Sequence, residues 1–402
     1  MNQPDVLDRR LARLPRSVLH AVHRQVEQAT RAGRDVLQLH VGEPAFGAPP
    51  AARAALIAAV VDGRTGYTNA EGMPELRERL ADRLAKADSV ATTPDRIVVT
   101  PGSSYALAAI VMAVCEPGDE ILLPEVFWPI YMQGAVVARA TVRTYSLGEG
   151  YRIEADRIRA AVSPATRLIV VNSPANPTGA LADPAELAEI ARWARRQDVW
   201  LIGDEAYEQF VYDGHHTALA SYERDVPDKE RRIFSVHTFS KGYGMTGYRM
   251  GYAAAPNEVT AATLRRVCEG TVIAPSTPVQ HAALAALDDE EMPKEAHAHV
   301  RAVRDAALTD AVNEGLLEHL PPAGWYAMVD VSSTGLSSAA FADRLLADHA
   351  VAVAPGATFV APEAPDPGRV RVAFCGDLDA TVEGMRRLRQ LTADLRTERN
   401  GA

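Results

Sequence analysis

Residues 237–251 read His237-Thr238-Phe239-Ser240-Lys241-Gly242-Tyr243-Gly244-Met245-Thr246-Gly247-Tyr248-Arg249-Met250-Gly251 and hold a single lysine among small, glycine-rich neighbours. A lysine that forms a Schiff base needs this setting, because its amine must be accessible and hydroxyl or cationic groups must lie nearby. A solvated surface charge is the ordinary interpretation of any lysine taken alone. Lys241 is therefore a candidate covalent centre whose significance depends on partners elsewhere in the chain.

Residues 242–247 also spell GxGxxG, the fingerprint of dinucleotide-binding loops. That fingerprint requires a helix that opens within the glycines and an acidic residue after the next strand. Here the glycines are followed by residues 248–255, Tyr-Arg-Met-Gly-Tyr-Ala-Ala-Ala, which we expect to form another strand. An NAD-dependent oxidoreductase is therefore the weaker alternative, and the yellow colour of a lysine Schiff base would separate the two.

The overall composition narrows the class of protein. With 402 residues, 47% of them hydrophobic, the chain is long enough for two domains and a buried site. A formal charge of −10 disfavours nucleic acid and anionic membranes as partners and favours small molecules. Three well-separated cysteines, no apolar run of membrane-spanning length and no export signal in Met1 to Arg13 indicate a cytoplasmic protein.

Short β-branched runs alternate with amphipathic stretches through the middle of the chain. This alternation predicts an α/β fold with a mostly parallel sheet between helices. Asp183 precedes Pro184, as at a helix start, and Glu186 has the spacing of a capping box. We expect strands near residues 97–99, 120–123, 141–145, 168–171, 200–203, 233–237 and 248–255, and helices over 104–115 and 184–197.

The pattern changes near Glu290 to a smaller α+β unit. It contains a long helix, a strand over 325–331, a helix over 338–349, a strand over 369–374 and a last helix. The N-terminal helix near 17–32 and residues 37–41 have no place in the central alternation, so we expect them to join this unit. The predicted domains are 50–289 for the large one and 1–49 plus 290–402 for the small one.

Residues 237–251 closely resemble the lysine motif of class I/II aminotransferases, the fold type I of aspartate aminotransferase. Four further blocks resemble that family in its order: Leu39-His40-Val41-Gly42-Glu43-Pro44, then Gly66-Tyr67-Thr68 before Gly72-Met73-Pro74-Glu75-Leu76-Arg77, then Asn176-Pro177-Thr178-Gly179, and Asp204-Glu205-Ala206-Tyr207. Five motifs in order make coincidence very improbable. The resemblance implies pyridoxal 5′-phosphate (PLP) as the cofactor, held by Lys241 as a Schiff base.

Each polar group of PLP has candidate binding residues in this chain. A buried carboxylate, Asp204, would keep the pyridine nitrogen protonated, and Tyr207 and Asn176 would bind the phenolic oxygen. The phosphate would bind at a helix start with hydroxyls and a forked cation, from Ser103, Ser104, Thr238 and Arg249. Trp128 would stack on the ring, and Tyr67 resembles the tyrosine that reaches the neighbouring subunit's phosphate, which implies a homodimer with shared sites. Taken singly, these are also ordinary helix caps, turns and core aromatics.

For the substrate, Arg371 matches the family's carboxylate-binding arginine, with Gly42, Trp128 and Asn176 assisting. Arg369 lies on the same face of the expected strand, so alternation cannot separate the two arginines. Lys241 would then move the proton that transamination requires, between an L-amino acid and a 2-oxo acid, through its aldimine and pyridoxamine phosphate. Ser104 stands where we expect a lysine in related prokaryotic aspartate enzymes, which disfavours dicarboxylic substrates. Val18, Leu19, Phe46, Phe127 and Trp325 are candidates for a side-chain pocket, although the core explains them equally well.

Three other function classes remain besides transamination. A PLP lyase or cyclase on the same scaffold would share every motif and differ only in substrate pose. The oxidoreductase is the second, and the third is a regulator fused to a DNA-binding domain, for which we expect no space before the Gly42 block. Metal catalysis is not expected, because solvation is the simpler interpretation of the histidines His215, His216, His297 and His299.

Overall fold

A computed structural model describes residues 18–401, and its centre is a seven-stranded sheet in the order β2-β8-β7-β6-β5-β3-β4. Only β8 runs antiparallel to its neighbours β2 and β7, and the other pairs in the sheet are parallel. The predicted mostly parallel α/β sheet is therefore confirmed. Its strands are β2 (Ile97–Thr100), β3 (Glu120–Pro124), β4 (Thr141–Tyr145), β5 (Thr166–Asn172), β6 (Trp200–Asp204), β7 (Ile233–Thr238) and β8 (Gly251–Ala254).

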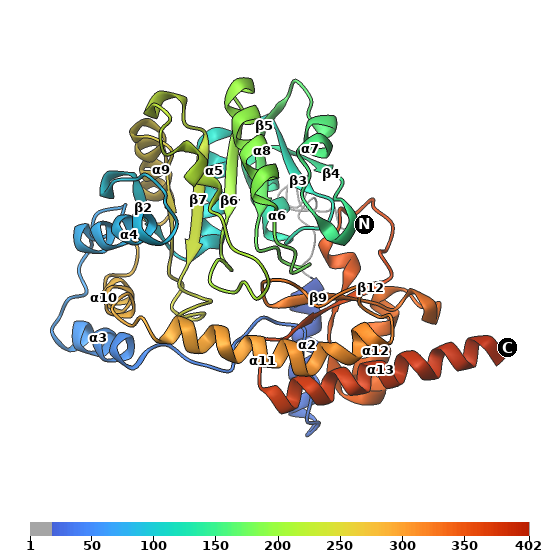
Figure 1. The fold of residues 1–402 in the computed structure, drawn as a ribbon. Helices are drawn as coiled ribbons and strands as arrows, with labels where there is room; N and C mark the ends of the chain where they lie inside the picture. The colour runs from blue at the N-terminus through green and yellow to red at the C-terminus, as the bar shows by residue number, and fades with distance from the viewer. Residues whose placement is uncertain (1–17, 402) are drawn as a thin grey trace, which may run out of the picture.

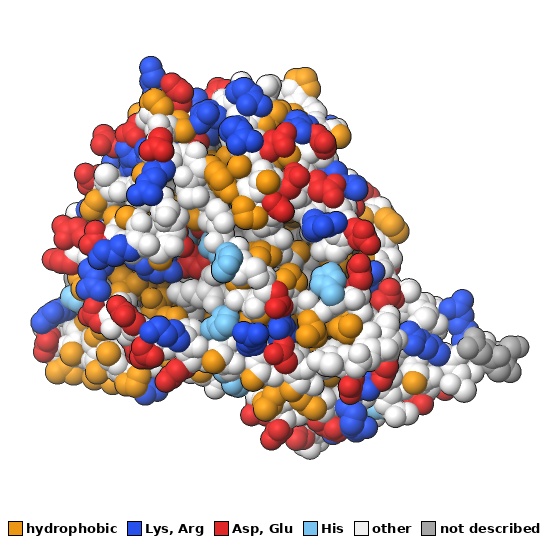
Figure 2. Space-filling model, viewed as in Figure 1, with side chains coloured by type: hydrophobic (Ala, Val, Ile, Leu, Met, Phe, Trp, Pro, Cys, Tyr) orange, Lys and Arg blue, Asp and Glu red, His pale blue; other side chains and the backbone are white. Residues whose placement is uncertain are grey.

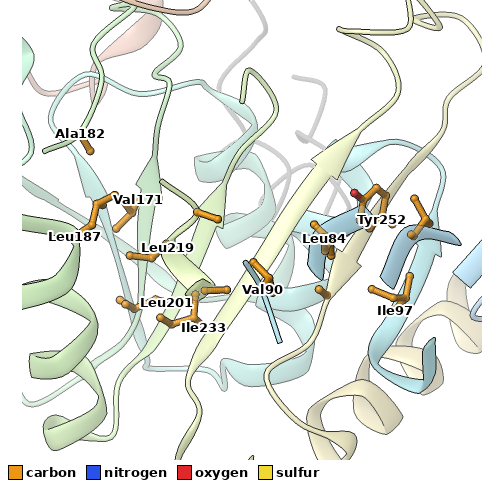
Figure 3. Packing of buried hydrophobic residues seen from close by; sticks show 14 of the residues in the cluster. Leu84, Val90, Ile97, Val171, Ala182, Leu187, Leu201, Leu219, Ile233 and Tyr252 are labelled. Carbon is orange, nitrogen blue, oxygen red and sulfur yellow. The ribbon is translucent and has the colours of Figure 1, made fainter. Parts of the chain in front are cut away.

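Helices cover both faces of this sheet (Figure 1). Successive strand residues enter different cores: Leu201 packs in one hydrophobic cluster and Ile202 in another. Because both faces are buried, the strands read as continuous apolar runs, as parallel strands do. Figure 3 shows Leu201, Ile233 and Tyr252 among the side chains of the first cluster. The helices of this part are α3 (Pro50–Val61), α4 (Pro74–Ala87), α5 (Ser103–Val114), α6 (Ile130–Ala138), α7 (Ala155–Ala161), α8 (Pro184–Gln197), α9 (Glu258–Thr271) and α10 (Thr277–Ala286).

A smaller unit joins the two ends of the chain. In Figure 1 the N-terminal helix α2 (Val18–Arg31) lies beside the C-terminal elements. Strand β1 (Leu37–Gln38) pairs in parallel with β10 (Val351–Ala352), while β11 (Ala354–Pro355), β12 (Arg369–Ala373) and β9 (Tyr326–Asp330) form an antiparallel sheet. The unit also contains α11 (Met292–Asn313), α12 (Ser338–His349) and α13 (Leu378–Gly401).

The hydrophobic clusters support a division into two domains. Ala52 and Ala286 belong to a cluster of the seven-stranded part, whereas Leu39 and Ala296 belong to the cluster of the smaller unit. We propose that 50–289 forms the large domain and that 1–49 with 290–402 forms the small one. Residues 1–17 of that proposal, including the start Met1 to Arg13, lie outside the described residues.

Two local predictions need correction. The strand expected over 248–255 begins only at Gly251, because residues 246–249 form a turn with Arg249 at a positive φ of 55°. Asp183 caps α8 through the N–H of Ala185, but Glu186 does not complete a capping box. Its carboxylate instead accepts a hydrogen bond from the N–H of Ala155 at 2.6 Å, a contact between two helices that local spacing cannot reveal.

The remaining general features are the surface charge, the apolarity of the helices and the state of the cysteines. Figure 2 shows acidic and basic side chains interspersed over the visible face, without an extended basic field. Within residues 18–401, none of the helices combines the length and apolarity needed to cross a membrane. Cys115, Cys268 and Cys375 are buried free thiols.

Candidate active site

The carboxyl ends of three parallel strands meet at one cavity of about 550 Å³. Asn172, Asp204 and Thr238 are the last residues of β5, β6 and β7, so parallel topology alone brings them to one edge. Helix α5 begins at the same edge with Ser103. Of the predicted site residues, the cavity is lined by Gly42, Ser103, Ser104, Trp128, Asn176, Asp204, Tyr207, Thr238, Lys241, Arg249 and Arg371.

Lys241 lies in the turn after β7, where the GxGxxG residues form turns and no helix begins. Its Nζ donates a hydrogen bond to the carbonyl of Gly42 at 3.3 Å. The same nitrogen lies 4.7 Å from the ring centroid of Trp325 and 5.4 Å from that of Tyr207. None of the ion pairs among residues 18–401 involves Lys241, so its amine faces rings and a carbonyl and no carboxylate of the described residues.

Asp204 is a buried carboxylate that has no cationic partner among residues 18–401. It is 2% exposed and accepts hydrogen bonds from the Tyr131 hydroxyl at 2.5 Å and from the N–H of Ala206 at 3.2 Å. Burial raises the pKa of Asp204, although these two hydrogen bonds oppose the shift. No ion pair of the described residues includes it, so a protonated ring nitrogen in the cavity would supply the missing partner.

The start of α5 forms a site for an anion. Gly102, at a φ of 81°, precedes Ser103, and no side chain caps the first N–H groups of the helix. Arg249 donates to the Ser104 hydroxyl at 3.3 Å and to the carbonyl of Thr246 at 2.7 Å, and it has no carboxylate partner in the described part of the chain. A Cβ on Gly102 would lie 2.5 Å from Nη2 of Arg249, and the positive φ at this position favours glycine independently. Amides, hydroxyls and one unpaired guanidinium fit a phosphate.

Arg371 also lines the cavity and is 2% exposed. Its Nη1 donates to Oδ1 of Asn176 at 3.1 Å and its Nη2 to the carbonyl of His40 at 2.7 Å, while Nε is buried without a partner. Burial lowers the pKa of Arg371 because no carboxylate compensates its charge. Arg369 instead lies outside the cavity lining, with its side chain 34% exposed and 3.6 Å from Asp330.

The remaining aromatic candidates separate into two groups. Trp128 is half-buried, with its ring centroid 5.9 Å from that of Tyr131, whereas Tyr67 is 87% exposed and does not line the cavity. Of the side-chain-pocket candidates, Leu19 lines the cavity, while Phe127 and Trp325 are buried and absent from its lining. Phe46 is half-buried against Trp325, and the side chain of Val18 lies outside the described residues.

Several cavity residues were not predicted from the sequence. Tyr131 lies three residues after Trp128, on the same side of a helical turn, and this spacing could have suggested it. Tyr326 carries no comparable local signal. The others that line the cavity without having been predicted as site residues are Val41, Glu43, Asn172, Ala206, Ser240, Thr246 and Gly247.

The expectation of solvated histidines is wrong for His216, whereas His297 and His299 are half-buried. His215 is exposed, but the His216 side chain is 10% exposed and its Nε2 lies 3.6 Å from Oε2 of Glu205. His297 and His299 each bond a backbone carbonyl at 2.9 Å. His216, Asp88 and Glu208 lie close enough for metal ligation, and Glu208 is also paired with Arg83 and with His237.

His40, whose carbonyl holds Arg371, should make stability depend on pH. Burial, His23 and Arg371 lower the pKa of His40 to about 4 from an ordinary value of 6.5. As pH falls below 6.5, the unfolded chain takes up the proton first, so native stability is lost between about pH 6.5 and 4, by about 3 kcal/mol. His40→Gln keeps the carbonyl and removes the titration. Urea unfolding at pH 7 and 4.5 should therefore show a smaller loss in this variant, and an equal loss would contradict the assignment.

Comparison with known proteins identifies the family. The sequence model for "Aminotransferase class I and II" matches residues 34–388. The chain is 34% identical over 368 residues to an aspartate/prephenate aminotransferase of Thermus thermophilus, covering 88% of this chain and 92% of that one. It is 32% identical to an arginine–pyruvate transaminase of Pseudomonas aeruginosa, covering 93% and 94%.

The fold agrees with the sequence comparison. The solved structure of Thermus thermophilus aspartate aminotransferase with maleate superposes with a TM-score of 0.88 at 30% identity, covering 97% of this chain and all of that one. The predicted family and fold are confirmed, and the relatives favour transamination over the lyase and cyclase alternatives. The chain belongs to the class I and II aminotransferase family and is an aminotransferase.

Proposed function

We propose that this aminotransferase uses PLP to move an amino group between an L-amino acid and a 2-oxo acid, with Lys241 as the attachment point and proton carrier. The observation that carries the proposal is the arrangement of Lys241, Asp204 and Arg371 around one cavity. Within residues 18–401 the Lys241 amine has no ion pair, the buried Asp204 carboxylate has no cation and the buried Arg371 guanidinium has no carboxylate. These three groups match the three parts of such a reaction.

The residues divide between the two bound molecules. Asp204 would bind the ring nitrogen, Tyr207 and Asn176 the phenolic oxygen, and Trp128 the ring face. Bound PLP draws electrons from the Cα of the amino acid and accepts its amino group. The phosphate would bind Ser103, Ser104, Thr238 and Arg249 at the start of α5.

The substrate is oriented by its carboxylate. Arg371 would bind it as a forked donor, assisted by Asn176 and the backbone of Gly42. This clamp fixes which bond of Cα stands perpendicular to the conjugated plane, and Nζ of Lys241 can then take the Cα proton. Lys241 is half-buried, and the rings of Trp325 and Tyr207 cover part of the surroundings of its amine.

We further propose a homodimer in which Tyr67 reaches the partner's phosphate site. Tyr67 is 87% exposed, and Ile57, Val60 and Val61 of α3 are also exposed apolar residues. Exposed apolar residues of this kind support a contact surface. Light scattering of the purified protein measures the assembly directly.

A panel of amino acids tests the function. Mixed with the PLP-loaded enzyme and no oxo acid, amino donors should convert the cofactor to its pyridoxamine form, measured by absorbance. Release of ammonia or carbon dioxide in its place would contradict transamination and favour the lyase class.

The same panel tests the side-chain preference. The cationic side chains that line the cavity, Lys241, Arg249 and Arg371, all have proposed roles, and Glu43 adds a negative charge. An unmatched distal carboxylate costs about 1–3 kcal/mol, so kcat/KM for aspartate and glutamate should be at least about tenfold below that for donors with neutral side chains. Equal or faster reaction of aspartate would contradict this preference.

A further inference from the structure

Tyr326, the first residue of β9, contacts both halves of the site. It is 3% exposed and lines the cavity. The Tyr207 hydroxyl donates a hydrogen bond to the Tyr326 hydroxyl at 3.2 Å, and the guanidinium carbon of Arg371 lies 4.1 Å from the centroid of the Tyr326 ring.

We propose that Tyr326 is a positioning residue that links the cofactor half of the site to the substrate half, its hydroxyl orienting Tyr207 and its ring orienting Arg371. The proposal rests on the proposed roles of Tyr207 and Arg371. The hydrogen bond between Tyr207 and Tyr326 joins residues 119 positions apart, so this link is made by the fold and not by neighbouring residues in the sequence.

The role of the Tyr326 hydroxyl follows from the number of protons that each phenol can donate. A phenol has one proton to donate, and in this structure Tyr207 gives it to Tyr326. If Tyr207 donates to a phenolic oxygen in the cavity, its own oxygen becomes free to accept, and the Tyr326 hydroxyl can rotate and donate to it. A hydroxyl that accepts a hydrogen bond is a stronger donor, so Tyr326 would strengthen the contact that Tyr207 makes. Burial and Tyr326 both raise the pKa of Tyr207, which keeps that proton in place.

The Tyr326 ring has a separate role, which is to position the guanidinium of Arg371. Arg371 is 2% exposed and has no carboxylate partner in residues 18–401, so its charge depends on neutral groups. The faces of Tyr326 and Phe359 lie 4.1 and 4.5 Å from its guanidinium carbon. Cation–π contacts are strongest when both groups are desolvated, as here. The two rings therefore hold the guanidinium in the plane that its bonds to Asn176 and His40 require.

The backbone at Gly42 lies close against the Tyr326 hydroxyl. A Cβ on Gly42 would lie 1.9 Å from the Tyr326 hydroxyl oxygen, which is far inside contact distance. Gly42 is also the residue whose carbonyl accepts the Lys241 hydrogen bond. The position of the Tyr326 hydroxyl thus requires glycine at the turn that contacts the reactive amine.

Two substitutions distinguish the role of the Tyr326 hydroxyl from that of its ring. Tyr326→Phe removes the hydroxyl and keeps the ring, whereas Tyr326→Leu removes both. The first measurement is the pH titration of the absorbance of the bound cofactor. The second is the dissociation constant of 4-methylpentanoate, an unreactive monocarboxylate, measured on the PLP-loaded enzyme.

For Tyr326→Phe we expect the absorbance titration to move upward by about half a pH unit, because Tyr207 becomes a weaker donor, with the 4-methylpentanoate constant unchanged within about twofold. For Tyr326→Leu we expect the same spectral shift and a dissociation constant at least about tenfold higher. Tyr212→Phe is the matched control, because this buried hydroxyl donates to the carbonyl of Gly324 and lies outside the cavity lining. It should move neither readout.

An unmoved titration in Tyr326→Phe would overturn the hydroxyl's role, and equal dissociation constants in the Leu variant and the parent would overturn the ring's. If Tyr326→Leu does not fold, as judged by circular dichroism, Tyr326→Met replaces it. A parent protein that binds no PLP, with no titrating band, would instead show that the proposed function fails. A normal parent beside an unresponsive Phe variant would show that only this inference fails.

Discussion

Lys241→Ala should abolish turnover, lowering kcat by roughly 10⁴-fold or more, since positioned acid–base catalysis alone contributes up to about 10⁴-fold. The substitution removes both the covalent attachment and the group that moves the Cα proton. No second amine can substitute, because Lys241 is the one lysine among the described residues that line the cavity. The measurement is the rate of amino-group transfer, together with borohydride reduction followed by mass spectrometry of the labelled peptide.

Lys229→Ala is the matched control, because Lys229 is an exposed lysine that does not line the cavity. It should keep both the activity and the borohydride-reducible bond. Retention of a reducible cofactor bond in Lys241→Ala would overturn the assignment of the attachment site.

Arg371→Ala should leave the cofactor's colour intact and raise the apparent KM for amino donors by about 10²- to 10³-fold. Hydrogen bonds to charged groups contribute about 1.5–3 kcal/mol each, and a forked guanidinium makes two with a carboxylate. The kcat at saturation should fall too, because the carboxylate also orients the reacting bond. Steady-state kinetics with the preferred donor, and absorbance spectra of the variant without substrate, measure both effects.

Arg369→Ala provides the comparison within the same strand. Arg369 faces Asp330 at 3.6 Å, and its guanidinium carbon lies 5.6 Å from the ring centroid of Tyr151, outside the cavity. Its removal should leave KM unchanged. A large rise in KM in Arg369→Ala, with an unchanged KM in Arg371→Ala, would move the carboxylate clamp to Arg369.

The two arginines also show what a sequence can and cannot predict. Both lie on one face of β12, so alternation gives them equal claims. The two arginines differ in their position along the strand: Arg371 pairs with Met328 in the middle of the small sheet, whereas Arg369 pairs with Asp330 at its end. Which position is buried depends on where the two units of the chain meet, and no local sequence pattern contains that information.

The contiguous motifs were predicted more completely. Asp204 and Thr238 end strands that the sequence marks clearly as apolar runs, and parallel topology then brings them to one edge. Tyr131 and Tyr326 were missed because their functional contacts are with Asp204 and Tyr207, 73 and 119 positions away. His216 was misjudged for the same reason, since its turn sequence predicts solvent and only the fold places Glu205 beside it.

Gly102 has a consequence for how such a chain can evolve. A side chain at position 102 would strain a backbone that has a φ of 81° and would crowd the guanidinium of Arg249, 147 positions away, so a change at Gly102 also disturbs the cation of the phosphate site. A combinatorial library aimed at new substrates should therefore keep this glycine fixed. Its diversity is better placed at Leu19, where the cavity is lined by a side chain with no polar contact to lose.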